Sequence, residues 1–314
     1  MARDIKNGVS IIVPTFRRAK GLQIALESLM NQTASALTME IIVADNDPAG
    51  SARDYVENFA KTAAIKTHYL HVPEPGVSNA RNGALKAAKG RYLAFLDDDQ
   101  QACAGWLQTL LDISKKYEAA LAFVPTHARI PGSSKFNDYL VDFFSRQGPD
   151  LTEGIVDDFF GCGNSLLDTH LCTLPAPPFN VDMNETGGED DLLFSELKSQ
   201  GIKIAWSRAA KANEDILPHR ATPAYVKVRS FANGQGPSQE CADNKNWLGV
   251  AKWMLVGAVQ YALYAPMALL TKITGKPSYI HYLAKSAGGA GKVLWFGGFT
   301  PKLYGAAVVE NTAY

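Results

Sequence analysis

The chain has 314 residues, in which 31 lysines and arginines balance 31 aspartates and glutamates. A chain of this length can bury a full hydrophobic core, and its zero net charge gives no overall field that would attract nucleic acid. The four cysteines show no C-x-x-C spacing, and the first seven residues are polar rather than an apolar leader. We therefore expect a cytoplasmic protein with reduced thiols that does not bind nucleic acid.

The first 120 residues alternate short apolar runs with helical stretches. Strands are predicted at 9–14, 39–45, 66–73 and 91–97, and helices at roughly 18–32, 50–62, 77–89 and 104–117. This alternation is typical of a parallel α/β sheet. Ligands of such sheets collect at the carboxyl ends of the strands, so we expect Pro14-Thr15, Asp45-Asn46 and Asp97 to Asp99 to meet at one site.

Beyond residue 120 the elements become shorter and the loops more polar. Short strands over 120–170 predict an antiparallel extension of the sheet. A helix is predicted at roughly 189–200, a strand around 202–206 and another helix over 222–234.

Residues 247–270 (WLGVAKWMLVGAVQYALYAPMALL) are mostly apolar. They are about long enough to span a bilayer, which takes ~20 residues. Lys252, Gln260 and Pro266 interrupt the segment, and the lysines that follow it (Lys272, Lys276, Lys285, Lys292 and Lys302) oppose translocation. We expect the segment to lie on or dip into the inner leaflet of the membrane; the alternative is a buried helix of a globular subdomain.

Three consecutive carboxylates, Asp97, Asp98 and Asp99, follow the apolar strand at 91–97. Adjacent like charges require a nearby cation, and an Asp-x-Asp pair presents two carboxylates on one face to a hard divalent ion that also binds phosphate. We expect Asp99 to bind Mg²⁺ or Mn²⁺ directly and Asp97 to contact a ribose or assist the ion. The alternative is that the acids cap the helix near 104, although one acid would suffice.

Two further strand and helix ends carry candidate binding groups. Asp45 could accept the imide N–H of a pyrimidine base, or it could form an Asx turn before Pro48. In the segment Ser78-Asn79-Ala80-Arg81-Asn82, the guanidinium of Arg81 could bind phosphate at a helix N-terminus. The alternative there is that Ser78 only caps the helix and Arg81 is solvated.

A second acidic cluster, Gly187-Gly188-Glu189-Asp190-Asp191, begins the helix at 189–200. The glycines permit close approach, and a carboxylate beside a sugar hydroxyl can remove its proton, which makes Asp190 the candidate general base. The alternative is acids that decorate a first helical turn. After the last strand, His219 could add a metal ligand and Arg220 could hold a diphosphate.

Five segments in this order, VSIIVPTFRR, IIVADND, SNARN, YLAFLDDD and GGEDDLLF, resemble the inverting family 2 glycosyltransferases over roughly residues 8–236. Within that family, FLDDD and GCGNSLL are most similar to bacterial exopolysaccharide glucosyltransferases of the succinoglycan type. The resemblance implies a GT-A fold, which is an α/β, Rossmann-like sheet that binds a nucleotide sugar and is flanked by helices, here with a C-terminal apolar helical segment. We expect a catalytic domain over 1–240, and from the apolar run at 247–270 a helical, membrane-associating segment over 241–314.

The resemblance also implies roles for individual residues. The UDP-sugar pocket would comprise Pro14, Thr15, Arg17, Asp45, Asn79, Arg81, Asp97 and Asp98. Asp190, with Glu189, would be catalytic, and Asp191 and Gly188 would face the acceptor. The metal would be held by Asp99 and Asp97. Relatives often carry a histidine near the position of Asn213, so either Asn213 or His219 would serve as a further ligand, or the ion would have fewer protein ligands.

The implied reaction is metal-dependent, inverting transfer of a single hexose, glucose by the narrower match, from a UDP-sugar to a lipid-linked saccharide at the inner membrane. The Gln-x-x-Arg-Trp signature of processive synthases is missing from the sequence, which favours one addition. One alternative is a nucleotidyltransferase, which predicts a Gly-rich loop where PTFRR stands. The other is a non-catalytic protein that binds nucleotide sugars.

Overall fold

The computed structural model describes residues 7–34 and 37–301. The polar residues 1–6 and Lys302 therefore lie outside the described part of the chain. Within it, the chain forms two compact units, which we call the sheet unit (residues 7–129 and 145–215) and the helical unit (residues 130–144 and 216–301). The domain boundary expected at residue 240 falls inside a helix of the helical unit, and the division into 1–240 and 241–314 stays a prediction.

The sheet unit is built on an eight-stranded sheet of order β3-β2-β1-β4-β9-β6-β10-β8. Its strands are β1 (Val9–Thr15), β2 (Met39–Asp45), β3 (Lys66–His71), β4 (Tyr92–Phe95), β6 (Leu121–Phe123), β8 (Glu153–Val156), β9 (Ser165–Asp168) and β10 (Ile204–Ser207). The strands β1 to β4 are mutually parallel, and β9 runs antiparallel to both β4 and β6. The predicted parallel half and its antiparallel extension are both confirmed.

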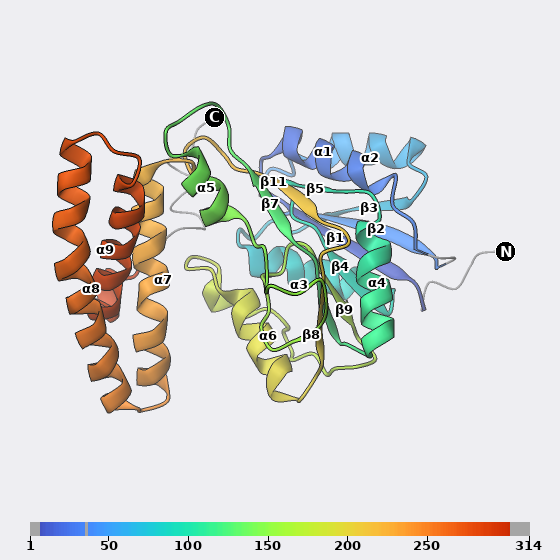
Figure 1. The fold of residues 1–314 in the computed structure, drawn as a ribbon. Coiled ribbons are helices and arrows are strands. Elements are labelled where there is room, and N and C mark those ends of the chain that lie inside the picture. The colour runs from blue at the N-terminus through green and yellow to red at the C-terminus, as the bar shows by residue number, and fades with distance from the viewer. Residues whose placement is uncertain (1–6, 35–36, 302–314) are drawn as a thin grey trace. The chain divides into compact units, whose positions relative to one another are not determined.

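Helices cover both faces of this sheet. The sheet-unit helices are α1 (Ala19–Leu29), α2 (Arg53–Thr62), α3 (Val77–Ala87), α4 (Trp106–Tyr117) and α6 (Glu189–Ser199), with a short η2 (Val181–Met183) before α6. Figure 1 shows α1 and α2 on one side of the sheet and α3 and α6 on the other. Side chains alternate along β1, so Ile11 and Val13 join one hydrophobic cluster and Ile12 joins the other. A sheet covered on both faces explains why β1 is apolar almost throughout.

A second, three-stranded sheet was not predicted. It consists of β5 (Gln100–Ala102), β11 (Ala212–Asp215) and β7 (Thr126–Arg129), with β11 in the middle. Because β5 lies between the three aspartates and α4, those acids do not reach the helix. The residue that caps α4 is Gly105, in the left-handed conformation and without a side-chain cap. The alternative that Asp97 to Asp99 cap this helix is therefore wrong.

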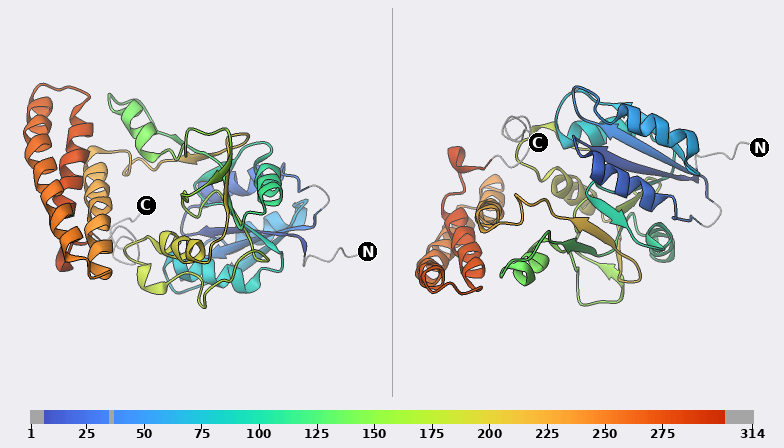
Figure 2. Two further views of the ribbon diagram at one scale, coloured as in Figure 1. Left: turned by 60° about the horizontal axis from the view of Figure 1, so that its bottom comes forward. Right: turned by 90° about the horizontal axis from the view of Figure 1, so that it is seen from above.

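The helical unit contains α5 (Asn137–Phe144), α7 (Pro223–Asp243), α8 (Trp247–Ile273) and α9 (Tyr279–Val293), followed by a short η3 (Gly297–Phe299). The predicted helix at 222–234 is longer than expected and is capped by the Thr222 hydroxyl, which accepts the Tyr225 N–H. The three long helices run side by side (Figure 2). Glycines allow this close packing, since a Cβ at Gly234 would lie 2.3 Å from the carbonyl oxygen of Gly288.

In the described chain, one helix, α8, is long and apolar enough to cross a membrane, and only 17% of its most apolar stretch is buried. Large side chains along it are well exposed, among them Leu248 at 86% and Ile273 at 75%. Such exposure does not fit the alternative of a buried core helix. An exposed apolar surface of this extent is typical of a lipid or protein interaction site.

Candidate active site

The middle aspartate of the triple cluster holds the loop after β1. Asp98 is buried, and one of its carboxylate oxygens accepts the Thr15 hydroxyl at 2.8 Å and the Phe16 N–H at 3.3 Å. Its other oxygen accepts Arg18 Nη1 at 2.9 Å. Asp98 and Thr15, both expected in the nucleotide pocket, thus bind each other and join the ends of β1 and β4.

The expected cation at the triple cluster is in part a protein side chain. Arg18 Nη1 lies 2.9 Å from Asp98 Oδ1 and 2.7 Å from Asp99 Oδ2. Burial raises the pKa of Asp99 to about 7; Arg18 opposes this, and the carboxylates of Glu214, Asp98 and Asp97 add to it. Arg18 was not among the residues expected at the site. Its neighbour Arg17 was expected in the nucleotide pocket and instead pairs with Asp47 at 3.1 Å. The two consecutive arginines after β1, Arg17 and Arg18, were the sequence signal that could have identified this cation.

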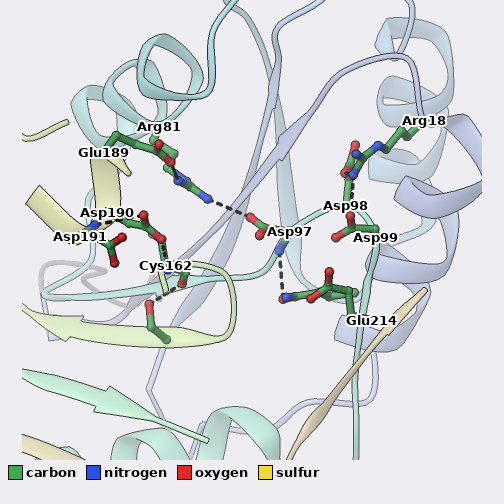
Figure 3. A network of polar contacts seen from close by, with 12 residues as sticks. Arg18, Arg81, Asp97, Asp98, Asp99, Cys162, Glu189, Asp190, Asp191 and Glu214 are labelled. Carbon is green, nitrogen blue, oxygen red and sulfur yellow. Dashed lines mark hydrogen bonds and ion pairs between the residues drawn. The ribbon is translucent and has the colours of Figure 1, made fainter. Parts of the chain in front are cut away.

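Asp97 belongs to a second network, which reaches the distant acidic cluster of α6 (Figure 3). Arg81 donates through Nη2 to Asp97 Oδ1 at 3.1 Å and through Nη1 to Glu189 Oε1. Its guanidinium lies 5.5 Å from the centre of the Phe179 ring. Arg81 is only 5% exposed, so the alternative of a solvated arginine is wrong. Burial raises the pKa of Glu189, and Arg81 opposes that rise.

Asp190 follows Glu189 in the first turn of α6. The helix begins after Gly187 and Gly188, both with positive φ angles, of 76° and 91°. Asp190 Oδ2 accepts the Cys162 N–H at 2.8 Å, and Oδ1 accepts the Asp191 N–H at 3.0 Å. The carboxylate is thus oriented by backbone donors and remains partly exposed.

The segment 161–163 contacts both acidic clusters. Cys162 binds Asp190, and an added Cβ at Gly163 would lie 2.1 Å from Asp97 Oδ2. Only glycine leaves room for the Asp97 carboxylate in this position. This segment carries part of the resemblance, in GCGNSLL, but none of its residues was expected at the site.

Asp45 forms the turn that was considered as an alternative to base binding. It is fully buried and accepts the Asp47 N–H at 3.1 Å, the Ala52 N–H at 2.9 Å and the Tyr69 hydroxyl at 3.0 Å. The bond to Asp47 is that of an Asx turn. A contact between Asp45 and a base stays a prediction.

Pro14 and Asn79, which were also expected in the UDP-sugar pocket, lie near the same strand ends. Pro14 is buried in β1 opposite Ala44, and the Asn79 amide donates to the carbonyl of Glu74 at 3.3 Å. Ser78 is not the helix cap, because α3 begins at Val77 and the Ser78 hydroxyl donates to the Asn180 carbonyl instead.

The candidate third metal ligands, Asn213 and His219, belong to different units of the chain. Asn213 donates to Cys103 Sγ at 3.3 Å, while His219 belongs to the helical unit. Glu214 pairs with Arg146 at 2.9 Å. The roles expected of His219 and Asn213 stay predictions.

Asp97 and Asp99 fit a divalent ion by the chemistry of their oxygens. No group of three or more acidic, histidine or cysteine side chains suited to a metal occurs in the described residues. Mg²⁺, however, is commonly bound through one or two carboxylates together with substrate phosphates and waters. Asp97, with a side chain 29% exposed, and Asp99, at 11%, match such a partial set.

Comparison with known proteins identifies the family. Residues 10–168 match the model of glycosyl transferase family 2. The succinoglycan biosynthesis protein ExoM of Rhizobium meliloti is 31% identical over 264 residues, which cover 83% of this chain and 84% of that protein. The WfaP enzyme of Escherichia coli, a UDP-Glc:alpha-D-GlcNAc-diphosphoundecaprenol beta-1,3-glucosyltransferase, is 26% identical over 62% of this chain and 72% of its own length.

A solved structure shows the same fold. The crystal structure of S. aureus TarS residues 1–349 in complex with UDP aligns with a TM-score of 0.51 and 17% identity, covering 91% of this chain and 90% of that one. The GT-A fold expected from the resemblance is therefore confirmed. The match to the family model over half of the chain, together with the likeness to ExoM over most of both lengths, shows that this protein belongs to glycosyl transferase family 2 and is a glycosyltransferase of the inverting type.

Proposed function

We propose that the protein transfers a single glucose from UDP-glucose to a lipid-linked saccharide in the synthesis of a bacterial cell-surface polysaccharide. The names of ExoM and WfaP support the pathway class, the donor and the lipid-linked acceptor. The observation that carries the proposal is the bridge from Asp97 through Arg81 to Glu189. It joins the strand end suited to a sugar diphosphate to the helix turn that carries the candidate base.

In this proposal the donor binds at the ends of β1, β2 and β4. Thr15 and Asp98 hold the loop after β1, and Pro14, Arg17, Asp45 and Asn79 complete the nucleotide pocket. Arg81 supplies positive charge near the diphosphate. Asp99 and Asp97 would hold Mg²⁺ or Mn²⁺, which would neutralise charge on the departing diphosphate.

Asp190 is the proposed general base. The acceptor hydroxyl oxygen attacks the anomeric carbon from the face opposite the diphosphate, a new C–O bond forms, and the old C–O bond breaks with its electron pair leaving on UDP. The hydroxyl proton passes to the Asp190 carboxylate, which the Cys162 N–H holds in place. The attack inverts the anomeric centre, so an α-linked donor gives a β-linkage. Such base catalysis typically contributes about 10²- to 10⁴-fold in rate.

The acceptor would approach from the side of Gly188 and Asp191, because Asp191 is the exposed neighbour of Asp190 on the same helical turn. The exposed apolar surface of α8 would hold the enzyme at the inner face of the membrane, as a peripheral or monotopic protein. This location would bring the site to a lipid-linked substrate.

The direct test supplies the purified full-length protein with a polyprenyl-diphosphate-linked saccharide and UDP-glucose, UDP-galactose or UDP-N-acetylglucosamine. We expect transfer from UDP-glucose in Mg²⁺ or Mn²⁺ and its loss in EDTA. Transfer of a nucleotidyl group, or binding of UDP-sugars without transfer or hydrolysis, would favour the nucleotidyltransferase or the non-catalytic alternative.

The base assignment has its own test. Asp190→Asn should retain UDP binding and lose transfer by about 10²-fold or more. The matched control is Glu196→Gln, which makes the same carboxylate-to-amide change at an exposed position of the same helix. Equal activities of the two variants would refute the role of Asp190.

A further inference from the structure

The helical unit contains a shallow pocket that is open to solvent, and none of its lining residues belongs to the candidate active site. It has a volume of about 260 Å³ and lies among α5, α7, α8 and α9. Its polar lining consists of Tyr139, Ser230, Asn233, Gln260, Lys285 and Lys292. Pockets for whole drug-sized ligands measure roughly 300–1,000 Å³, so this one fits a small headgroup better than a saccharide.

The pocket is positively charged and lacks an acidic partner. Lys285 and Lys292 both line it, and in the described chain neither forms an ion pair with a carboxylate. Lys292 Nζ lies 3.2 Å from Gln260 Oε1 and 3.5 Å from the Gly288 carbonyl. Burial and then the neighbouring Lys285 lower the pKa of Lys292. Two ammonium groups beside hydroxyl and amide donors form a site for an anion with several oxygens.

The helical unit is basic, although the net charge of the whole chain is zero. Residues 130–144 and 216–301 carry ten lysines and arginines against four aspartates and glutamates. None of those four acids, Asp138, Asp142, Glu240 and Asp243, lines the pocket. The helical unit therefore favours anionic ligands, although the chain as a whole does not.

An apolar path lies beside the pocket on α8. Gln260 lines the pocket, and the residues one helical turn before and after it, Val256 and Leu263, are 39% and 61% exposed. Residues three or four apart share a helix face, so these apolar side chains flank Gln260 on the surface. Exposed Val259, Met267 and Leu270 extend the apolar surface along the same helix.

We infer that this pocket binds the diphosphate of a prenyl-linked molecule, with the prenyl chain lying along the exposed apolar surface of α8. The juxtaposition of an unpaired cationic pocket and an apolar path matches an amphiphile with a phosphorylated head. The choice of a prenyl diphosphate over a glycerophospholipid rests on the proposed function, in which the acceptor is a polyprenyl-linked saccharide.

The experiment titrates the full-length protein in mild detergent with farnesyl diphosphate, inorganic pyrophosphate and farnesol by calorimetry. We expect farnesyl diphosphate to bind more tightly than either part alone. Lys285→Gln combined with Lys292→Gln should weaken its binding by about tenfold or more, as expected for lost charged hydrogen bonds. Lys276→Gln, the same change at an exposed lysine outside the pocket, should leave binding unaltered.

Lys285→Gln alone keeps the test valid if the double variant misfolds, since Lys285 is exposed and makes no side-chain bond among the described contacts. The site is overturned if Lys276→Gln weakens binding of farnesyl diphosphate as much as the pocket variants do. It is also overturned if the pocket variants do not weaken that binding. Pyrophosphate that binds as tightly as farnesyl diphosphate overturns the role of α8. A short-chain phosphatidylglycerol that binds as tightly and depends equally on Lys285 overturns the assignment to a prenyl diphosphate.

These outcomes are separable from those of the proposed function, because the titration contains no UDP-sugar. Hydrolysis of UDP-glucose in water should be the same in the Lys285→Gln variant and the wild type, whereas KM for the lipid-linked saccharide should rise. If the protein binds farnesyl diphosphate as expected but transfers no sugar, the result counts against the proposed function and not against the pocket.

Discussion

Asp97 and Glu189 bind the same guanidinium, that of Arg81, although they follow a strand and begin a helix far apart in the chain. The bridge aligns the two acidic clusters that the proposed reaction needs. Arg81 achieves this because its planar group offers two separate N–H donors, one to each carboxylate.

Replacing Arg81 by lysine should disrupt that alignment while keeping the positive charge. A single ammonium cannot reproduce the two directed contacts, and a displacement of about 1 Å at a reacting group can cost 10²-fold in rate. We expect Arg81→Lys to lower kcat/KM for transfer by about that factor. The matched control is Arg91→Lys, because Arg91 binds Asp168 through two nitrogens at 2.7 and 2.6 Å, remote from the proposed chemistry. Similar rate losses in both variants would show a general effect on folding.

Gly163→Ala tests the position of Asp97 without removing any charged group. The added Cβ would lie 2.1 Å from Asp97 Oδ2, so the carboxylate must move. We expect weaker metal-dependent binding of UDP and slower transfer. Gly236→Ala, at a helical position with open space around it, should change neither quantity. Wild-type UDP affinity in Gly163→Ala would refute the contribution of Asp97.

Asp99→Asn should stabilise the protein in EDTA and in the absence of donor. The folded state raises the pKa of Asp99 to about 7, mainly by burial, so it disfavours the ionised carboxylate. This penalty is complete above pH 7 and disappears as the pH falls from about 7 towards 4. The variant should therefore melt at a higher temperature than the wild type at pH 8, by about 2–4 °C for each kcal/mol gained, with a smaller difference at pH 5.

Thermal unfolding at several pH values measures this effect, with Asp112→Asn as the control. Asp112 is an exposed aspartate on α4 and should show no pH-dependent gain. The same Asp99→Asn variant should lose metal-dependent affinity for UDP. A variant that is less stable than the wild type at pH 8 would contradict the energetic cost assigned to the Asp99 charge.

Charges placed on α8 should release the protein from membranes. Leu263 and Leu270 are 61% and 63% exposed, and burial of a leucine side chain in an apolar environment is worth about 1.5–3 kcal/mol. We expect Leu263→Glu with Leu270→Glu to weaken binding to anionic phospholipid vesicles by at least about tenfold in a flotation assay. Ile155→Glu, at a 45% exposed position of β8, should have no effect. Unchanged flotation of the α8 variant would exclude this helix as the membrane contact.

The polar segments that mark the family could be recognised from the sequence because they follow regular elements. Alternating strands and helices predict a sheet with its ligand site at one edge, and Thr15, Asp45 and Asp97 do lie at the ends of neighbouring parallel strands. The apolar character of α8 was equally visible, since every residue of a long apolar run contributes to that signal.

The partners of each charged side chain were decided by the tertiary structure. Asp97, Asp98 and Asp99 are chemically identical, yet Asp98 holds the β1 loop, Asp99 binds Arg18 and Asp97 binds Arg81. The pocket around Lys285 and Lys292 likewise depends on α9 packing between α7 and α8. Local patterns specify strands, helices and their exposed ends, whereas ion pairs and pockets depend on distances between segments remote in sequence, which only the packed chain determines.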